Sequence, residues 1–145
     1  MSIDPSDPLP DPLIVVAAAL VREDGRVLVQ RRPPGRAMAG LWEFPGGKLE
    51  AGETPEAALA RELGEELGIA VATAAMRPCS FATGRVGARP LVLLLYLVRE
   101  WAGEPRALEA TALSWETPAG MRALAMPPAD GPLVGALTRA LDAAL

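Results

Sequence analysis

The sequence contains no histidine and only one cysteine, and both facts exclude particular kinds of chemistry. Without histidine there can be no Ser-His or Cys-His catalytic triad, and a zinc site is disfavoured because such sites usually draw on histidine or several cysteines. Cys79 cannot form a disulfide within the chain, which fits a reducing compartment. Any catalytic site must therefore use other side chains.

The sequence also lacks a hydrophobic run long enough to cross a bilayer. The apolar runs at residues 13–21 and 90–98 have nine residues each, whereas a membrane helix needs about 20. Acidic rather than basic residues precede the first run, so no signal-peptide pattern surrounds it. We therefore expect a cytoplasmic protein with no membrane partner.

The composition of the 145 residues suits one compact domain, because half of them are hydrophobic. The net charge of -4 disfavours a nucleic-acid polymer as partner. An acidic protein that binds a polyanion needs local cations, supplied by arginines or by a metal. Residues 1–12 are rich in proline and aspartate and predict a flexible arm, whereas residues 13–145 predict a single domain. Its oligomeric state, monomer or homodimer, stays open.

Apolar runs and turn residues predict several strands, with one early and one late helix. Asp24-Gly25 is a strong hairpin signal because the turn needs positive φ. A turn is expected at residues 101–105, and leucines at helical spacing follow Pro132 as far as Leu145. Such an order favours a mixed sheet between helices. The predicted strands are residues 13–21, 26–30, 41–44, 90–98 and 112–117.

The early helix has clear start and stop signals. A glycine-rich loop at residues 45–53 leads to Thr54, a good N-cap, and to Pro55 at the first helical position. Gly68 provides the stop after Leu67. At about 100° per residue, leucines form one apolar face of this helix.

Three glutamates, Glu62, Glu65 and Glu66, stand at the C-terminal end of this helix, where the helix dipole disfavours acids by a few tenths of a kcal/mol each. Glu62 and Glu66 also repel each other at i,i+4. No lysine has the spacing to pair with them, and their arc lies beside the leucine face, so we expect them in a cleft. A solvated acidic face is the alternative. A divalent cation would remove the repulsion, and oxygen ligands suit Mg²⁺ or Mn²⁺.

From Gly47 to Ile69 the sequence fits the pattern G-x5-E-x7-R-E-U-x-E-E-x-G-U, where U is a bulky aliphatic residue. This segment resembles the Nudix box of the Nudix hydrolases, and the neighbouring "LWEFPGG", "WAGEP" and "PPAD" resemble its MutT branch, which cleans nucleotide pools. The resemblance implies an α/β/α sandwich with a mixed central sheet. The matched positions are Gly47, Glu53, Arg61, Glu62, Leu63, Glu65, Glu66, Gly68 and Ile69.

The resemblance also implies a reaction and assigns roles. We expect Mg²⁺-dependent hydrolysis of nucleoside triphosphates to monophosphate and pyrophosphate, with oxidised dNTPs such as 8-oxo-dGTP as substrates and Mn²⁺ as a possible substitute metal. The three helix glutamates and the carbonyl of Gly46 are the expected metal ligands, and Arg61 is expected to orient Glu53. In this family a further glutamate that serves as metal ligand or base often follows a strand. Here Arg99 stands at that place, and Glu100, the possible further metal ligand, comes one residue later, on the other strand face. Glu53, Glu62 and Glu100 all stay open as the general base.

Residues outside the box match the family less closely. Arg32 is expected to bind phosphate, because a guanidinium can clasp phosphate oxygens, although a surface arginine is the alternative. Trp42 is expected in the core and Phe44 beside the base. Asp130 stands where the MutT pattern has asparagine. An ionised carboxylate only accepts hydrogen bonds, so it suits the amino group of cytosine and repels guanine O6 unless protonated. An ordinary turn aspartate is the alternative.

Three other functions remain open on this sequence. Asp130 favours a hydrolase of CTP or a modified cytidine triphosphate. An ADP-sugar hydrolase has less support, because no second polar cluster for a terminal ribose is evident. A nucleotide-sensing regulator on the same scaffold is disfavoured, because a sensor has no need of every metal ligand.

Overall fold

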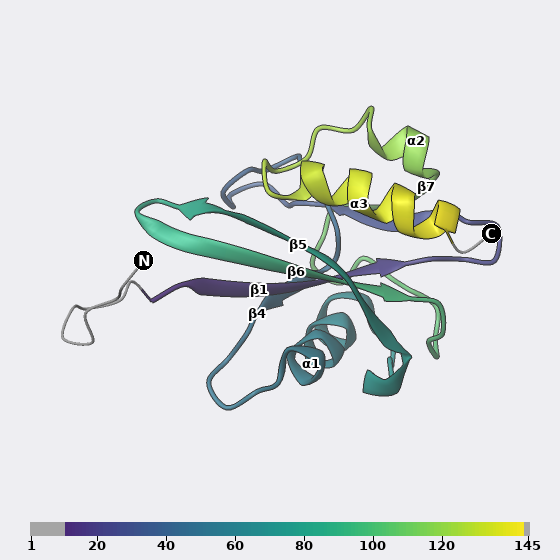
Figure 1. Ribbon diagram of the computed structural model, residues 1–145, viewed down its shortest axis with the longest axis horizontal. Coiled ribbons are helices and arrows are strands. Elements are labelled where there is room, and N and C mark those ends of the chain that lie inside the picture. Colours follow the sequence, from purple (N-terminus) through teal and green to yellow (C-terminus); the bar gives the residue numbers. More distant parts are fainter. Residues whose placement is uncertain (1–10, 144–145) are drawn as a thin grey trace.

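Strand β1 (Leu13–Leu20) is one of the two inner strands of the larger of two sheets in the computed structural model, which describes residues 11–143 (Figure 1). It pairs antiparallel with β4 (Gly46–Lys48) and parallel with β6 (Arg89–Val98). Strand β6 pairs antiparallel with β5 (Met76–Val86), giving the order β4-β1-β6-β5. Alternate β1 residues point into two separate cores, so both faces of the strand are buried. This explains its unbroken apolar sequence.

The smaller sheet is antiparallel and has the order β3-β2-β7, formed by β3 (Trp42–Glu43), β2 (Val27–Arg31) and β7 (Ala112–Glu116). The predicted hairpin at Asp24-Gly25 is confirmed: the Arg22 N–H donates to the Arg26 carbonyl at 2.9 Å, and Gly25 has φ 83°. Beyond this turn β1 and β2 separate into different sheets. The prediction of one mixed sheet is therefore confirmed for the larger sheet, and the second sheet was not foreseen.

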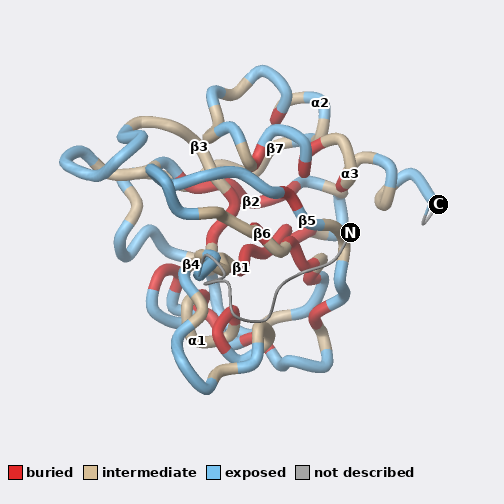
Figure 2. Tube along the Cα trace, turned by 60° about the vertical axis from the view of Figure 1, so that its left-hand side comes forward, coloured by how far each residue is buried: buried red, intermediate tan, exposed pale blue. Residues whose placement is uncertain are grey.

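Helix α1 (Pro55–Leu67) covers one side of the larger sheet, whereas α2 (Pro118–Met121) and α3 (Asp130–Ala143) lie on the opposite side (Figure 1). The predicted ends of α1 are confirmed. The Thr54 hydroxyl accepts the Ala57 N–H at 3.2 Å, and Gly68 has φ 70°. The buried residues gather between the helices and the central strands (Figure 2). Leu59, Leu63 and Leu67 of α1 are all fully buried, as their spacing predicts.

The sequence did not indicate β5, α2 or the short 3-10 helix Thr73–Ala75. Among the described strands, β5 lies at the edge of its sheet with one neighbour, so it tolerates Pro78 and a bulge between Pro78 and Ser80. Helix α3 begins at Asp130, two residues before the predicted start. Residues 1–10 of the predicted arm, and Leu145, lie outside the described residues.

Between residues 11 and 143, no helix has both the length and the apolar composition that a membrane span would need.

Gly46 is required where β4 approaches β1. A Cβ at this position would overlap the carbonyl oxygen of Val16 and lie 2.7 Å from the Cα of Ala17, and neither backbone atom can move aside. We expect Gly46→Ala to lower the free energy of unfolding by about 3 kcal/mol or more. Gly131→Ala is the matched control, because a Cβ there meets no atom within 4 Å. Urea denaturation of both variants measures the difference, and equal stabilities would contradict this packing.

Candidate active site

The carboxylate of Glu66 lies where α1, β4 and β2 meet. Its Oε2 accepts the Gly46 N–H at 3.2 Å and the Gln30 side-chain Nε2 at 3.0 Å. Glu66 is only 9 % exposed, and no arginine or lysine among the described residues forms an ion pair with it. The site therefore buries an acid that has hydrogen-bond donors but no positive charge.

Burial is the main cause that raises the pKa of Glu66 to about 8, and the negative charges of Glu62 and Glu43 act in the same direction. The two hydrogen bonds to Oε2 lower this pKa without restoring its ordinary value. Burial likewise raises the pKa of Glu62, although Arg61 opposes the shift. Both shifts indicate a place where a bound cation would favour the ionised acids.

The two glycines that begin β4 each contact one of these glutamates. Gly46 donates its N–H to Glu66, whereas a Cβ at Gly47 would overlap the Glu62 carboxylate. Glycine at position 47 therefore leaves the space that the Glu62 side chain fills. Because β4 is held in register on β1, the main chain beside both acids is fixed.

Arg61 joins several acids on the outer side of this site. Its guanidinium binds Glu53 through two hydrogen bonds of 2.8 and 2.9 Å, so the expected contact between these residues is present. This contact is the main cause that lowers the pKa of Glu53. Arg61 also donates to Glu62 at 2.8 Å and to Glu65 at 3.5 Å. Arg61 is thus the positive partner of Glu62 and Glu65, for which the sequence offered no lysine at a suitable spacing.

Glu65 does not join the other two glutamates in this structure. Its side chain is 54 % exposed, compared with 15 % for Glu62. Across residues 11–143, no three acidic, histidine or cysteine side chains are grouped as a ready metal site. The structure therefore brings together Glu62, Glu66 and Gly46, whereas Glu65 would reach them only after leaving Arg61.

One face of the smaller sheet presents polar side chains toward Glu66. Gln30 and Glu43 are paired across β2 and β3. Glu43 accepts a hydrogen bond of 2.9 Å from Arg32, whose side chain is 28 % exposed. Sequence reasoning selected Arg32 but missed Gln30 and Glu43. The available signal was strand alternation, since Glu43 has the opposite parity to the core residue Trp42.

Asp130 is buried at the first position of α3, so the alternative interpretation of an ordinary turn aspartate does not fit the structure. It is 6 % exposed at the start of α3, and its Oδ2 accepts the Phe44 N–H at 3.3 Å. Burial raises the pKa of Asp130 to about 7; the charge of Glu43 adds to this, whereas the Phe44 N–H and Arg32 oppose it.

The two aromatic residues of this segment lie in or against the core that faces α3. Phe44 is 3 % exposed there, and Trp42 packs against the same core. Phe44 therefore contacts Asp130 through its backbone N–H. Its buried ring has little surface free to bind a nucleotide base.

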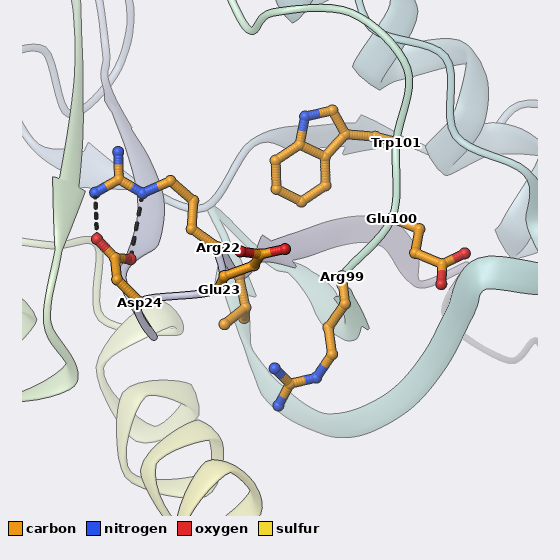
Figure 3. A pocket seen from close by; sticks show the side chains of 7 residues that line it. Arg22, Glu23, Asp24, Arg99, Glu100 and Trp101 are labelled. Atoms are coloured by element: carbon orange, nitrogen blue, oxygen red, sulfur yellow. Dashed lines mark hydrogen bonds and ion pairs between the residues drawn. The ribbon is translucent and has the colours of Figure 1, made fainter.

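Glu100 lies away from these acids. It is exposed beyond the end of β6 and lines an open pocket beside the β1–β2 turn, where Arg22 is paired with Asp24 (Figure 3). Glu100 was a possible further metal ligand, but none of the other expected ligands, Gly46, Glu62, Glu65 and Glu66, lines that pocket. Glu109 is the later glutamate whose charge raises the pKa of Glu62. The Leu108 N–H next to it donates to the Glu66 carbonyl at 3.1 Å, which holds this loop against α1. Sequence reasoning missed Glu109, because its loop has no periodic pattern.

The fold and the site define a class of protein. Buried carboxylates, close main-chain glycines and a nearby arginine are the parts that metal-assisted phosphoryl chemistry uses. Comparison with known proteins agrees, because residues 11–136 match the family described as the NUDIX domain. The chain belongs to the NUDIX family and is a hydrolase that acts on pyrophosphate bonds.

Individual relatives match over most of their length. A CTP pyrophosphohydrolase of Escherichia coli is 41% identical over 124 residues, covering 86% of this chain and 90% of that protein. An 8-oxo-dGTP diphosphatase of the same organism is 36% identical over 130 residues, covering 86% and 95%. The solution structure of the E. coli ORF135 protein superposes with a TM-score of 0.82 at 38% identity, covering 95% of this chain and 97% of that one. The expected fold class and family are therefore confirmed.

The burial of Glu66 predicts a measurable effect of pH on stability. The ordinary pKa of 4.5 applies to the unfolded chain, whereas the folded value is about 8. Ionisation of Glu66 therefore lowers the free energy of unfolding progressively between about pH 4.5 and pH 8. Above about pH 8 the loss of stability is complete. In excess chelator, we expect Glu66→Gln to be more stable than wild type at pH 8.5, by an amount on the order of a few kcal/mol. At pH 4.5 the two should nearly coincide.

Urea denaturation at both pH values measures this difference, with Glu65→Gln as control, because the Glu65 side chain is 54 % exposed. A lower stability of Glu66→Gln at pH 8.5 would mean that the buried carboxylate does not destabilise the metal-free fold.

Proposed function

We propose that this protein hydrolyses nucleoside triphosphates to the monophosphate and pyrophosphate, using Mg²⁺ or, in its place, Mn²⁺. The observation that carries the proposal is the buried Glu66 carboxylate, which has donors on one oxygen, another acid beside it and no ion-pair partner in the described part of the chain. A dissolved nucleotide as substrate is consistent with the cytoplasmic location expected from the sequence.

The donor set suits a hard divalent cation. Glu62 and Glu66 supply carboxylate oxygens, Gly46 supplies a carbonyl oxygen, and Glu65 can add a further oxygen after rotating away from Arg61. When bound, Mg²⁺ neutralises phosphate charge and lowers the pKa of a coordinated water. Arg61 keeps Glu53 and Glu62 in place through its hydrogen bonds. Arg32, now paired with Glu43, is suited to bind phosphate oxygens.

The choice of general base changes in the light of the structure. Glu100 loses support because it lies beside the β1–β2 turn. Glu109 replaces it as a candidate, since it is exposed and close enough to Glu62 to raise the pKa of that residue. Glu53 has less support because its carboxylate is bound on both oxygens by Arg61.

Asp130 is the candidate for base selection. Because its pKa is about 7, it is a hydrogen-bond donor when protonated below that pH and only an acceptor above it. The protonated form suits guanine O6, as in 8-oxo-dGTP, and the ionised form suits the amino group of cytosine. The CTP pyrophosphohydrolase among the relatives supports the second substrate. The ADP-sugar and regulator alternatives have no comparable observation in their favour.

Turnover should depend on the metal and on the helix glutamates. We expect no pyrophosphate release in excess chelator and recovery with Mg²⁺ or Mn²⁺. Glu65→Gln and Glu66→Gln should each lose most of kcat, because transition-state charge stabilisation worth several kcal/mol is removed. Glu23→Gln, an exposed acid in the β1–β2 turn, is the control. Near-normal kcat in either helix variant would exclude that residue as a metal ligand.

Asp130→Asn should change base preference and leave the scissile bond unchanged. An amide both donates and accepts at every pH, so the variant should favour 8-oxo-dGTP over CTP. A single buried hydrogen-bond mismatch is worth about 1–3 kcal/mol, so the ratio of kcat/KM values should move roughly ten- to a hundredfold.

In the wild type the same ratio should move toward CTP as the pH rises through about 7, whereas Asp130→Asn should remove this dependence. Asp142→Asn, at an exposed position of the same helix, is the control. Equal losses on all nucleotides would show that Asp130 has no part in selecting the base.

A further inference from the structure

Gln30 is the only carboxamide side chain of this protein, because the sequence has one glutamine and no asparagine. It follows Val27, Leu28 and Val29, all fully buried, and is itself 5 % exposed. Glutamine is mostly found on protein surfaces. A buried polar side chain directly after these three apolar residues therefore needs a reason other than packing.

The two ends of the Gln30 amide have different surroundings. Its Nε2 donates to Glu66 Oε2 at 3.0 Å, whereas its Oε1 is buried without a hydrogen-bond partner among the described residues. When Glu66 is ionised, as metal binding requires, its oxygens only accept hydrogen bonds, so the amide nitrogen has to face it. A buried acceptor that lacks a partner destabilises the fold. The hydrogen bond that Nε2 donates to Glu66 is therefore the reason for a glutamine at position 30.

The hydrogen bond from Gln30 is one of two that hold the same oxygen of Glu66. Gln30 reaches Oε2 from β2, the Gly46 N–H reaches it from β4, and Glu66 itself projects from α1. Two donors on Oε2 resist rotation of the carboxylate. Oε1 is consequently the oxygen left available for another ligand.

We infer that Gln30 is a positioning residue, which holds the Glu66 carboxylate in the orientation that leaves its Oε1 available to a divalent cation. This inference rests on the proposed function, because it needs Glu66 to be a metal ligand. Mutating a residue that orients a metal ligand through a hydrogen bond typically lowers the metal affinity roughly 10- to 100-fold.

The test is calorimetric titration of Mn²⁺ into the full chain, without nucleotide. Gln30→Met keeps the length of the side chain and removes the donor, and Gln30→Leu serves if the first variant does not fold. Leu28→Met is the matched control, because Leu28 is buried in the same strand, on the side toward α1, and donates no side-chain hydrogen bond. Thermal melting in chelator verifies that each variant is folded.

We expect Gln30→Met to weaken Mn²⁺ binding about tenfold, and Leu28→Met to stay within about twofold of wild type. If Gln30 acts through Glu66, adding Gln30→Met to Glu66→Gln should weaken binding no further. Affinity unchanged in Gln30→Met, or a second full loss in the double variant, overturns the inference. If the wild type binds no Mn²⁺, or if Glu66→Gln binds it as wild type does, the proposed metal site itself fails.

Discussion

The burial of the Glu66 carboxylate is the constraint on which the rest of the site depends. A carboxylate removed from water needs donors, and two arrive from different elements, Gly46 of β4 and Gln30 of β2. The first donor requires β4 to lie directly on β1, which only glycine at position 46 permits. The second requires the smaller sheet to close over the C-terminal half of α1. The contact between the two sheets and the helix is thus fixed around one acid.

The early helix tolerates its acidic end because tertiary packing holds it in place. Three fully buried leucines and a capped N-terminus fix α1 on the sheet, and burying each leucine contributes about 2 kcal/mol. The dipole and the like-charge pair oppose the helix by only a few tenths of a kcal/mol each. Desolvation of Glu66 is the larger opposing effect, since it raises the pKa to about 8. A bound cation would offset this desolvation, because it favours the ionised carboxylate. The acids that destabilise the metal-free helix are therefore the same acids that are proposed to bind the metal.

Local patterns were enough to predict the hairpin at Asp24-Gly25, both ends of α1 and the buried strand β6, because each depends on residues close together in the sequence. The edge strand β5 was missed, since Pro78 and the bulge between Pro78 and Ser80 interrupt its alternation of buried and exposed residues.

Within the site, the Arg61–Glu53 contact was expected from the family resemblance. Gln30 and Glu109 were missed because the acids that they lie near, Glu66 and Glu62, are far away in the chain. The burial of Asp130 could not be derived from local sequence, since it depends on how α3 packs beside Phe44.

We propose that Glu66, Glu62 and the Gly46 carbonyl together hold a divalent cation. A crystal structure with Mn²⁺ and a non-hydrolysable nucleoside triphosphate tests it most directly, because anomalous scattering locates the metal. We predict a peak at hard-cation bonding distance, roughly 2.0 to 2.5 Å, from Glu66 Oε1 and the Gly46 carbonyl oxygen. A metal bound instead by Glu50 and Glu53, with Glu66 contacting only Gly46 and Gln30, would contradict the account.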